Sequence, residues 1–261
     1  MMKRGKGFYG IRLIFIALLT IYGCSSTDII ETPAPTTSEL PTPEPTTPNP
    51  TPSGGDDESK DFKYLALGDS YTIGESVCES CRFPVQLVNR YNEDSEDILS
   101  TKIIAHTGWR TDNLIDAIDR ENPDADYDLV TLLIGVNNQY QSKSFSQYEK
   151  EFPELLNTAI QLAGGDASNV IVVSIPDYAY TPYGQGTSNP EKISQEIDNY
   201  NDFAQSNTEA RNIIFLNITD ITRRGLQEPD LVASDGLHPS TVAYKEFVDR
   251  LLPLIQNKLS D

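Results

Sequence analysis

The chain has 261 residues, of which 38% are hydrophobic, and its 39 acidic residues outnumber 20 basic ones to give a formal net charge of −19. A polyanion gains nothing from contacts with phosphate groups, so this charge excludes nucleic acid as a partner. The length suits one large domain or two small ones. Eight of the 17 prolines fall within residues 31–60, which divides the chain into three parts of different composition.

Residues 1–23 have the layout of an export signal. They hold four basic residues and no acidic one, and they end in an apolar run over residues 13–22. A run of ten residues cannot span a bilayer core of about 30 Å, so it is typical of a secretory signal and not of a transmembrane helix. The segment ends in Ile21-Tyr22-Gly23-Cys24, which resembles the lipobox of bacterial lipoproteins. The resemblance implies cleavage before Cys24 and attachment of lipid to its thiol; the alternative is an ordinary signal peptide followed by an incidental cysteine.

Residues 24–60 contain a Pro/Thr-rich stretch with almost no apolar residues, so they cannot bury a core. Proline favours extended geometry at about 3.1 Å per residue, which would hold the next domain several tens of ångströms from its attachment point. We therefore predict a lipoprotein signal peptide in residues 1–23, a disordered stalk in residues 24–60 and a folded domain in residues 61–261. This organisation predicts a protein of the bacterial cell envelope, lipid-anchored through Cys24 and facing the periplasm or the cell surface. Cleavage would leave a formal charge near −23, because it removes four basic residues and no acidic one.

From residue 62 onward, apolar runs alternate with amphipathic stretches. Most of the runs are continuously apolar, as expected of strands covered on both faces; the predicted strands are residues 64–67, 102–105, 129–134, 170–175 and 213–216. The predicted helices are residues 84–91, 111–120, 146–162, 191–210 and 240–259, with Thr111 and Ser146 as N-caps and Gly164-Gly165 as a stop. Strand–helix alternation repeated five times predicts an α/β fold, a doubly wound five-stranded parallel sheet in a three-layer α/β/α arrangement.

Open parallel sheets bind ligands beyond the carboxyl ends of their strands, so the residues that follow the predicted strands are candidates for a site. Gly68-Asp69-Ser70 follows the first strand and can present a hydroxyl at a helix start, where backbone N–H groups stabilise negative charge. Gly108 follows the second strand; a glycine lets a substrate approach the backbone closely and leaves its N–H free to donate. Each of these segments, taken alone, also fits an ordinary turn.

Two further segments carry polar groups that could take part in catalysis. Asn137 follows the third strand, and its side-chain amide is a neutral donor suited to a developing oxyanion, although asparagine is also common in turns. Asp235 precedes His238 by three residues, just before the last predicted helix. A carboxylate in that position can hold the imidazole tautomer that leaves the other ring nitrogen as a base. The alternative is a surface histidine with an ordinary hydrogen bond.

The order Ser, Gly, Asn and Asp-x-x-His along the chain resembles that of the SGNH hydrolases, also called GDSL esterases/lipases, and the resemblance covers essentially all of residues 61–261. It implies the flavodoxin-like SGNH fold. It also implies that Ser70 is the nucleophile, that His238 is the general base, and that Asp235 orients His238 and balances its charge.

The resemblance further implies an oxyanion hole made of the Ser70 and Gly108 backbone N–H groups and the Asn137 side chain. The family's third block usually reads Gly-x-Asn-Asp, and here Asn138 stands at the position of the aspartate. Asparagine keeps the acceptor oxygen and loses the charge. Since that position supports the site and does not react, we expect the geometry of the loop to survive.

The expected chemistry is acyl transfer to Ser70 followed by hydrolysis, with no metal and no cofactor. We favour a small acyl ester or an acylated glycan as substrate, with short acyl groups such as O-acetyl, because the chain offers no long apolar lid and its acidity disfavours anionic lipid surfaces. The alternatives are a lysophospholipase or thioesterase of the same family, transfer of the acyl group to another alcohol, and a catalytically silent domain that binds glycans. We expect a monomer.

The remaining candidates have structural explanations. A zinc site at Cys78 and Cys81 would need a second cysteine pair, so in an exported protein we expect a local disulfide in the loop after the nucleophile. His106 lacks an acid at triad-like spacing, and we expect it at the edge of the pocket or in a structural role. Our hypothesis for the aromatic residues at or beyond strand ends is that they stack on sugars. These residues are Trp109, Tyr140, Tyr178, Tyr180 and Tyr183.

Overall fold

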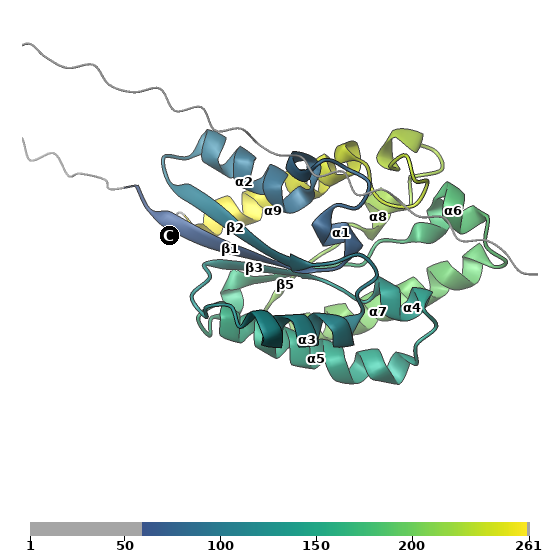
Figure 1. Ribbon diagram of the computed structural model, residues 1–261, viewed down its shortest axis with the longest axis horizontal. Coiled ribbons are helices and arrows are strands. Elements are labelled where there is room, and N and C mark those ends of the chain that lie inside the picture. The colour runs from purple at the N-terminus through teal and green to yellow at the C-terminus, as the bar shows by residue number, and fades with distance from the viewer. Residues whose placement is uncertain (1–58, 260–261) are drawn as a thin grey trace, which may run out of the picture. The chain divides into compact units, whose positions relative to one another are not determined.

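The computed structural model describes residues 59–259 (Figure 1). The predicted signal peptide, Cys24 and nearly all of the predicted stalk lie outside the described residues. Five parallel strands form one sheet in the order β2-β1-β3-β4-β5. They are β1 (Asp61–Gly68), β2 (Ile98–Ala105), β3 (Leu129–Leu133), β4 (Val170–Val173) and β5 (Ile214–Leu216). The predicted doubly wound, five-stranded parallel sheet is confirmed.

Helices cover both faces of the sheet (Figure 1). On one face, α2 (Phe83–Asp94) packs against α9 (Thr241–Leu259). On the other face, α5 (Phe145–Leu162) packs between α3 (Thr111–Glu121) and α7 (Pro190–Glu209). The shorter α-helices are α1 (Ser70–Ile73), α4 (Val136–Tyr140), α6 (Pro182–Gln185) and α8 (Thr219–Thr222). Single 3₁₀ turns are η1 (Glu79–Cys81), η2 (Ala167–Asn169), η3 (Tyr178–Tyr180) and η4 (Pro229–Leu231). Within residues 59–259, no helix is long and apolar enough to cross a membrane.

The core lies on both sides of the central strands. All residues of β3 and of β4 are buried, which explains why their sequences are continuous apolar runs and not alternating ones. Full burial of a Val, Leu or Ile side chain contributes roughly 1.5–3 kcal/mol. These two strands therefore form a firm base for the loops that follow them.

Two of the predicted helix caps are wrong. The N-cap of α3 is Arg110, and Thr111 is the first helical residue, because its hydroxyl is bonded to Asn138 and Glu151 and does not cap the helix. The N-cap of α5 is Ser144, two residues before the predicted one. The predicted stop lies where expected: α5 ends at Leu162, and Gly164 and Gly165 follow with φ of 68° and 83°. Glycine adopts this left-handed conformation without the steric cost that other residues incur.

The register of the sheet sets the position of the site. Gly68, the last residue of β1, lies opposite Ala105 of β2 on one side and Leu133 of β3 on the other. The chain runs from β1 outward to β2 and then crosses back to β3, so the strand order reverses at β1. Ligand sites of open α/β sheets lie at such a reversal, beyond the carboxyl ends of the strands. The loops after β1, β2 and β3 therefore begin side by side.

Candidate active site

Ser70 is the first residue of α1 and directly follows the tight turn that leaves β1. Asp69 is fully buried and caps α1 by accepting a hydrogen bond from the Tyr71 N–H (3.0 Å). At Gly68, an added Cβ would lie 2.1 Å from Thr72 Oγ1, so the turn has room only for glycine. Ser70 is 3% exposed and lies just beyond the carboxyl end of β1.

The three predicted oxyanion donors lie around this serine. Gly108 has a φ of 81°, and the space beside its Cα is open, so the backbone conformation and not crowding requires glycine there. Its carbonyl accepts a hydrogen bond from Gln141 Nε2 (2.8 Å), which ties the loop after β2 to the end of α4. Within residues 59–259, the backbone N–H groups of Ser70 and Gly108 have no protein acceptor. They are free to donate to a ligand.

The third donor, Asn137, is 8% exposed, and its side-chain amide donates to Asp69 Oδ2 at 3.4 Å. This long contact orients the amide without fully using it. Burial raises the pKa of Asp69 to about 7, and the hydrogen bonds from the Tyr71 N–H and from Asn137 act in the opposite direction. Asp69 therefore holds both the turn that carries Ser70 and the orientation of the Asn137 side chain.

Asn138 is fully buried, and it connects the loop after β3 to the start of α3. Its Oδ1 accepts from the Thr111 N–H (3.1 Å), and its Nδ2 donates to Thr111 Oγ1 (2.7 Å). The Thr111 hydroxyl can then donate onward to Glu151. An aspartate at position 138 has no Nδ2 and could not donate to Thr111 Oγ1. The neighbouring Thr111 therefore suits the asparagine that stands here in place of the family's usual aspartate.

His238 is held by its own turn. Asp235 Oδ2 contacts His238 Nδ1 at 2.6 Å, and Asp235 Oδ1 accepts from the N–H groups of Leu237 (2.9 Å) and His238 (3.0 Å). The His238 ring packs against the Tyr71 ring, with the centroids 5.1 Å apart. The bond to Asp235 occupies Nδ1, which leaves Nε2 as the ring nitrogen for proton transfer.

Ser76 is a site residue that the sequence did not reveal. Its hydroxyl donates to Asp235 Oδ2 at 2.6 Å, the same oxygen that contacts the His238 ring. Burial alone would raise the pKa of Asp235, but the hydrogen bonds from Ser76, from His238 and from the backbone outweigh burial and hold the pKa at about 2. Asp235 is therefore a carboxylate at neutral pH. Ser76 has a φ of 65° and precedes it by 159 residues, so no sequence pattern links the two.

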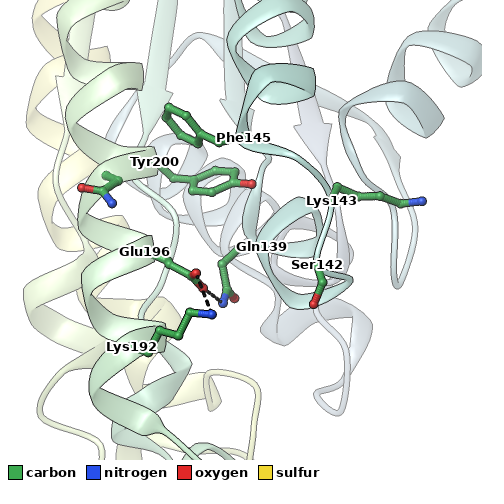
Figure 2. A pocket seen from close by; sticks show the side chains of 8 residues that line it. Gln139, Ser142, Lys143, Phe145, Lys192, Glu196 and Tyr200 are labelled. Carbon is green, nitrogen blue, oxygen red and sulfur yellow. Dashed lines mark hydrogen bonds and ion pairs between the residues drawn. The ribbon is translucent and has the colours of Figure 1, made fainter.

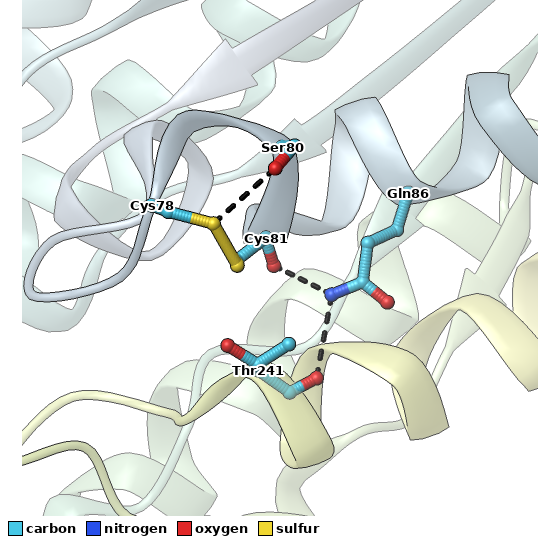
Figure 3. The surroundings of a disulfide bond; sticks show 5 residues. All are labelled: Cys78, Ser80, Cys81, Gln86 and Thr241. Atoms are coloured by element: carbon cyan, nitrogen blue, oxygen red, sulfur yellow. Dashed lines mark hydrogen bonds between the residues drawn. A yellow bond between two sulfur atoms is a disulfide. The ribbon is translucent and has the colours of Figure 1, made fainter.

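Ser76 belongs to the loop that carries the cysteine pair. Cys78 and Cys81 are joined by a disulfide (Figure 3). The Cys81 carbonyl accepts from Gln86 Nε2 (2.5 Å), which also reaches the Thr241 carbonyl (3.3 Å) at the start of α9. The loop after the nucleophile is thus joined to the helix that follows His238. This loop contacts the site through the hydrogen bond from Ser76 to Asp235, and it does not line the cavity described next.

A cavity of about 220 Å³ brings the predicted residues together. Its lining consists of Ser70, Tyr71, Thr107, Gly108, Val136, Asn137, Tyr140, Tyr178, Leu237 and His238. Within the described chain, no hydrogen bond joins the Ser70 hydroxyl to the His238 ring. Such contacts are often long without substrate and tighten when it binds.

Of the aromatic residues at the strand ends, two line the cavity and the others lie outside its lining. Tyr140 and Tyr178 line the cavity with ring centroids 5.8 Å apart, and the Tyr140 and Tyr183 hydroxyls share a hydrogen bond of 2.6 Å. Trp109 lies outside the lining and stacks on His106 at 5.6 Å. The last, Tyr180, faces the Arg223 guanidinium at 5.9 Å.

Attack by a hydroxyl on an ester needs a base to take its proton and donors to receive the charge that develops on the carbonyl oxygen. The cavity offers a hydroxyl, an imidazole backed by a carboxylate, and N–H donors from three different loops. The protein is a serine ester hydrolase. The chain belongs to the GDSL-like Lipase/Acylhydrolase family, which matches residues 66–246.

Solved structures agree with this family. The lipase/acylhydrolase from Enterococcus faecalis is 22% identical, covers 76% of this chain and 96% of its own, and superposes with a TM-score of 0.57. The acetylxylan esterase Axe2 from Geobacillus stearothermophilus is 18% identical, with 76% and 95% covered and a TM-score of 0.57. The psychrotrophic esterase EstA from Pseudoalteromonas sp. is 17% identical, with 77% and 100% covered and a TM-score of 0.53. At these identities, the likeness shows the fold. The curated proteins give no match.

Proposed function

We propose that the protein hydrolyses short acyl esters, in particular O-acetyl groups, through an acyl-enzyme on Ser70. His238 Nε2 takes the Ser70 proton while Oγ attacks the ester carbonyl, and Asp235 stabilises the imidazolium through Nδ1. The carbonyl oxygen becomes an oxyanion. It is held by the N–H groups of Ser70 and Gly108 and by the side-chain amide of Asn137.

The tetrahedral intermediate then collapses, and His238 returns its proton to the leaving alcohol. Water repeats the sequence on the acyl-enzyme: His238 takes a proton from water, and the resulting hydroxide attacks the acyl carbon. His238 then returns this proton to Ser70 Oγ as the bond between Oγ and the acyl carbon breaks and the carboxylic acid leaves. Water and the ester substrate are the groups outside the chain that this proton balance uses.

The size of the cavity is the observation that carries the choice of a short acyl group. Pockets for drug-sized ligands are usually about 300–1,000 Å³, whereas this cavity measures about 220 Å³. Tyr140 and Tyr178 form one wall, and the bond between the Tyr140 and Tyr183 hydroxyls fastens that wall to the start of α6. One of the solved structures of similar fold is named an acetylxylan esterase, which accords with a small acyl group.

The test is a series of p-nitrophenyl esters from acetate to palmitate, with Ser70→Ala measured in parallel. We expect kcat/KM to be highest for acetate or propionate, to fall with chain length, and to disappear in Ser70→Ala. A maximum at long chains would overturn the short-acyl proposal and favour a lysophospholipase or thioesterase.

We further propose that the domain is attached to the bacterial cell envelope by lipid on Cys24, at the end of a stalk formed by residues 24–60. The support is the sequence alone: a basic and then apolar segment, followed by Gly23-Cys24 and by a Pro/Thr-rich stretch. The test is labelling of growing cells with an alkyne-tagged fatty acid. We expect label on the full chain and none on Cys24→Ala, whereas equal labelling of both would refute the attachment.

A further inference from the structure

A second, larger cavity lies next to the acyl cavity, between α7 and the corner that joins α4 to α5 (Figure 2). It measures about 480 Å³. The rings of Tyr200 and Phe145 lie on one side of it, and Gln139, Glu196 and Lys192 lie together on another. None of the predicted site residues lines this cavity.

Tyr200 gives the first indication of a ligand. The residue is 4% exposed, and its ring packs against Phe145 (5.0 Å between centroids) and Tyr148 (4.6 Å). Its hydroxyl points into the cavity and has no hydrogen-bond partner within residues 59–259. A phenylalanine would pack equally well at this position. The hydroxyl is therefore not needed for packing, and it is placed where a ligand can reach it.

Glu196 and Lys192 form an ion pair in this cavity, whereas the ammonium of Lys143, which also lines it, points away from Glu196 and Tyr200 (Figure 2). Glu196 contacts Lys192 Nζ at 3.5 Å and accepts from Gln139 Nε2 at 2.8 Å. Burial, together with the nearby Glu196 carboxylate, raises the pKa of Tyr200 to about 12, so its hydroxyl stays neutral and can both donate and accept. A cationic ligand would have to displace Lys192, and an anionic ligand would meet the Glu196 carboxylate.

Apart from Lys143, the lining side chains without a partner in the described chain are neutral. They are the hydroxyls of Tyr200 and Ser142 and the side-chain amide of Asn199, all of which line the cavity. Neutral donors and acceptors beside aromatic rings suit a ligand with many hydroxyl groups and no net charge. The chemical class that fits is a neutral sugar ring.

One side chain separates the two cavities. Gln139 Oε1 accepts from the Tyr178 hydroxyl (2.8 Å), which belongs to the acyl cavity, and its Nε2 donates to Glu196 in the second cavity. The next residue of α4, Tyr140, lines the acyl cavity. We propose that the second cavity is a subsite for a neutral glycosyl unit of an acylated glycan whose acyl group occupies the first cavity. This assignment rests on the proposed esterase function.

The test compares two acetylated probes, mono-O-acetylated methyl xyloside and O-acetylated xylotetraose. Loss of one hydrogen bond to a bound sugar corresponds to roughly a 3- to 10-fold weaker interaction. We expect Tyr200→Phe to raise KM for the tetrasaccharide by about that factor relative to KM for the monosaccharide. The matched control is Tyr127→Phe, which removes a hydroxyl just before the amino end of β3. The site follows the carboxyl ends of the strands, so this variant should leave the ratio of the two KM values unchanged.

A binding measurement separates the failure of this proposal from the failure of the esterase proposal. Ser70→Ala is titrated with unacetylated xylotetraose, cellotetraose and chitotetraose, and the titrations are repeated in Ser70→Ala with Tyr200→Phe. We expect at least one of these sugars to bind, and to bind more weakly to the double variant. If wild type hydrolyses p-nitrophenyl acetate but no sugar binds and the KM ratio is unchanged, the subsite is refuted. If wild type hydrolyses no ester, the esterase proposal fails, and with it the subsite that rests on it.

Discussion

Replacing Asp69 with asparagine tests the electrostatics of the turn that carries Ser70. Asp69 is fully buried, and burial raises its pKa to about 7 from an ordinary 3.8. The folded state therefore holds a proton that the unfolded chain has already released. The sign follows from this difference: the protein is stabilised fully below pH 4 and loses that stability as the pH rises towards 7.

The size of the effect follows from the same two values. A pKa of about 7 against 3.8 corresponds to a loss on the order of 4 kcal/mol between acid and alkaline pH. About 2 kcal/mol of this loss falls between pH 5.5 and pH 8.5, a range clear of the acidic isoelectric point. Asparagine does not titrate. The unfolding free energy of Asp69→Asn minus that of wild type should therefore rise by about 2 kcal/mol across this range.

The assay is urea unfolding at several pH values, followed by the fluorescence of the single tryptophan, Trp109. The new amide facing Asn137 lowers the unfolding free energy of the variant by an amount that does not depend on pH. This amount therefore does not affect how the difference between variant and wild type changes with pH. The same variant should lose kcat, because the amide of Asn137 donates to Asp69 and would lose its acceptor. A difference in unfolding free energy that does not change with pH would mean that Asp69 is ionised throughout this range and that burial does not raise its pKa.

Three further variants test other contacts of the site. Asn137→Ala should keep the fold and reduce kcat about 10²- to 10³-fold, measured with p-nitrophenyl acetate; near-normal activity in a folded variant would remove Asn137 from the oxyanion hole. Ser76→Ala removes a hydrogen bond to the Asp235 carboxylate; we expect the unfolding free energy to fall by about 1.5–3 kcal/mol, and kcat to fall about tenfold with little change in KM. An unchanged kcat would limit Ser76 to a structural role. Tyr140→Ala breaks the bond to the Tyr183 hydroxyl and widens the acyl cavity, so kcat/KM for hexanoate should rise relative to acetate by roughly 10-fold or more. An unchanged chain-length profile would show that this wall does not limit the acyl group.

Much of the fold could be predicted because burial shapes local sequence. The run over residues 129–134 predicts a strand, and β3 covers 129–133, since a strand covered on both faces needs apolar residues throughout. Helix boundaries were less predictable. Thr111 has the chemistry of an N-cap, but long-range contacts with Asn138 and Glu151 take up its hydroxyl. Local preference cannot anticipate a partner that the fold supplies from elsewhere.

The same distinction applies to the site. Ser70, Gly108, Asn137 and His238 could be named from the sequence because each follows a strand or precedes a helix at a fixed point of a recurrent fold, and they line one cavity. Ser76 could not be named, because its role depends on a loop conformation that brings it to Asp235.

The second cavity was also out of reach of the sequence. Its walls come from α7 and from the corner between α4 and α5. Tyr200 and Gln139, which meet there, carry no motif. Their importance arises only from the way the helices pack over the sheet.

Covalent labelling can show whether Ser70 is the nucleophile. The intact protein is treated with a p-nitrophenyl alkylphosphonate, and its mass and peptide map are measured. We expect a single adduct on Ser70, no adduct in Ser70→Ala, and slow labelling in His238→Ala, because the hydroxyl then lacks its base. Labelling of another residue, or equal labelling of wild type and Ser70→Ala, would show that Ser70 is not the nucleophile.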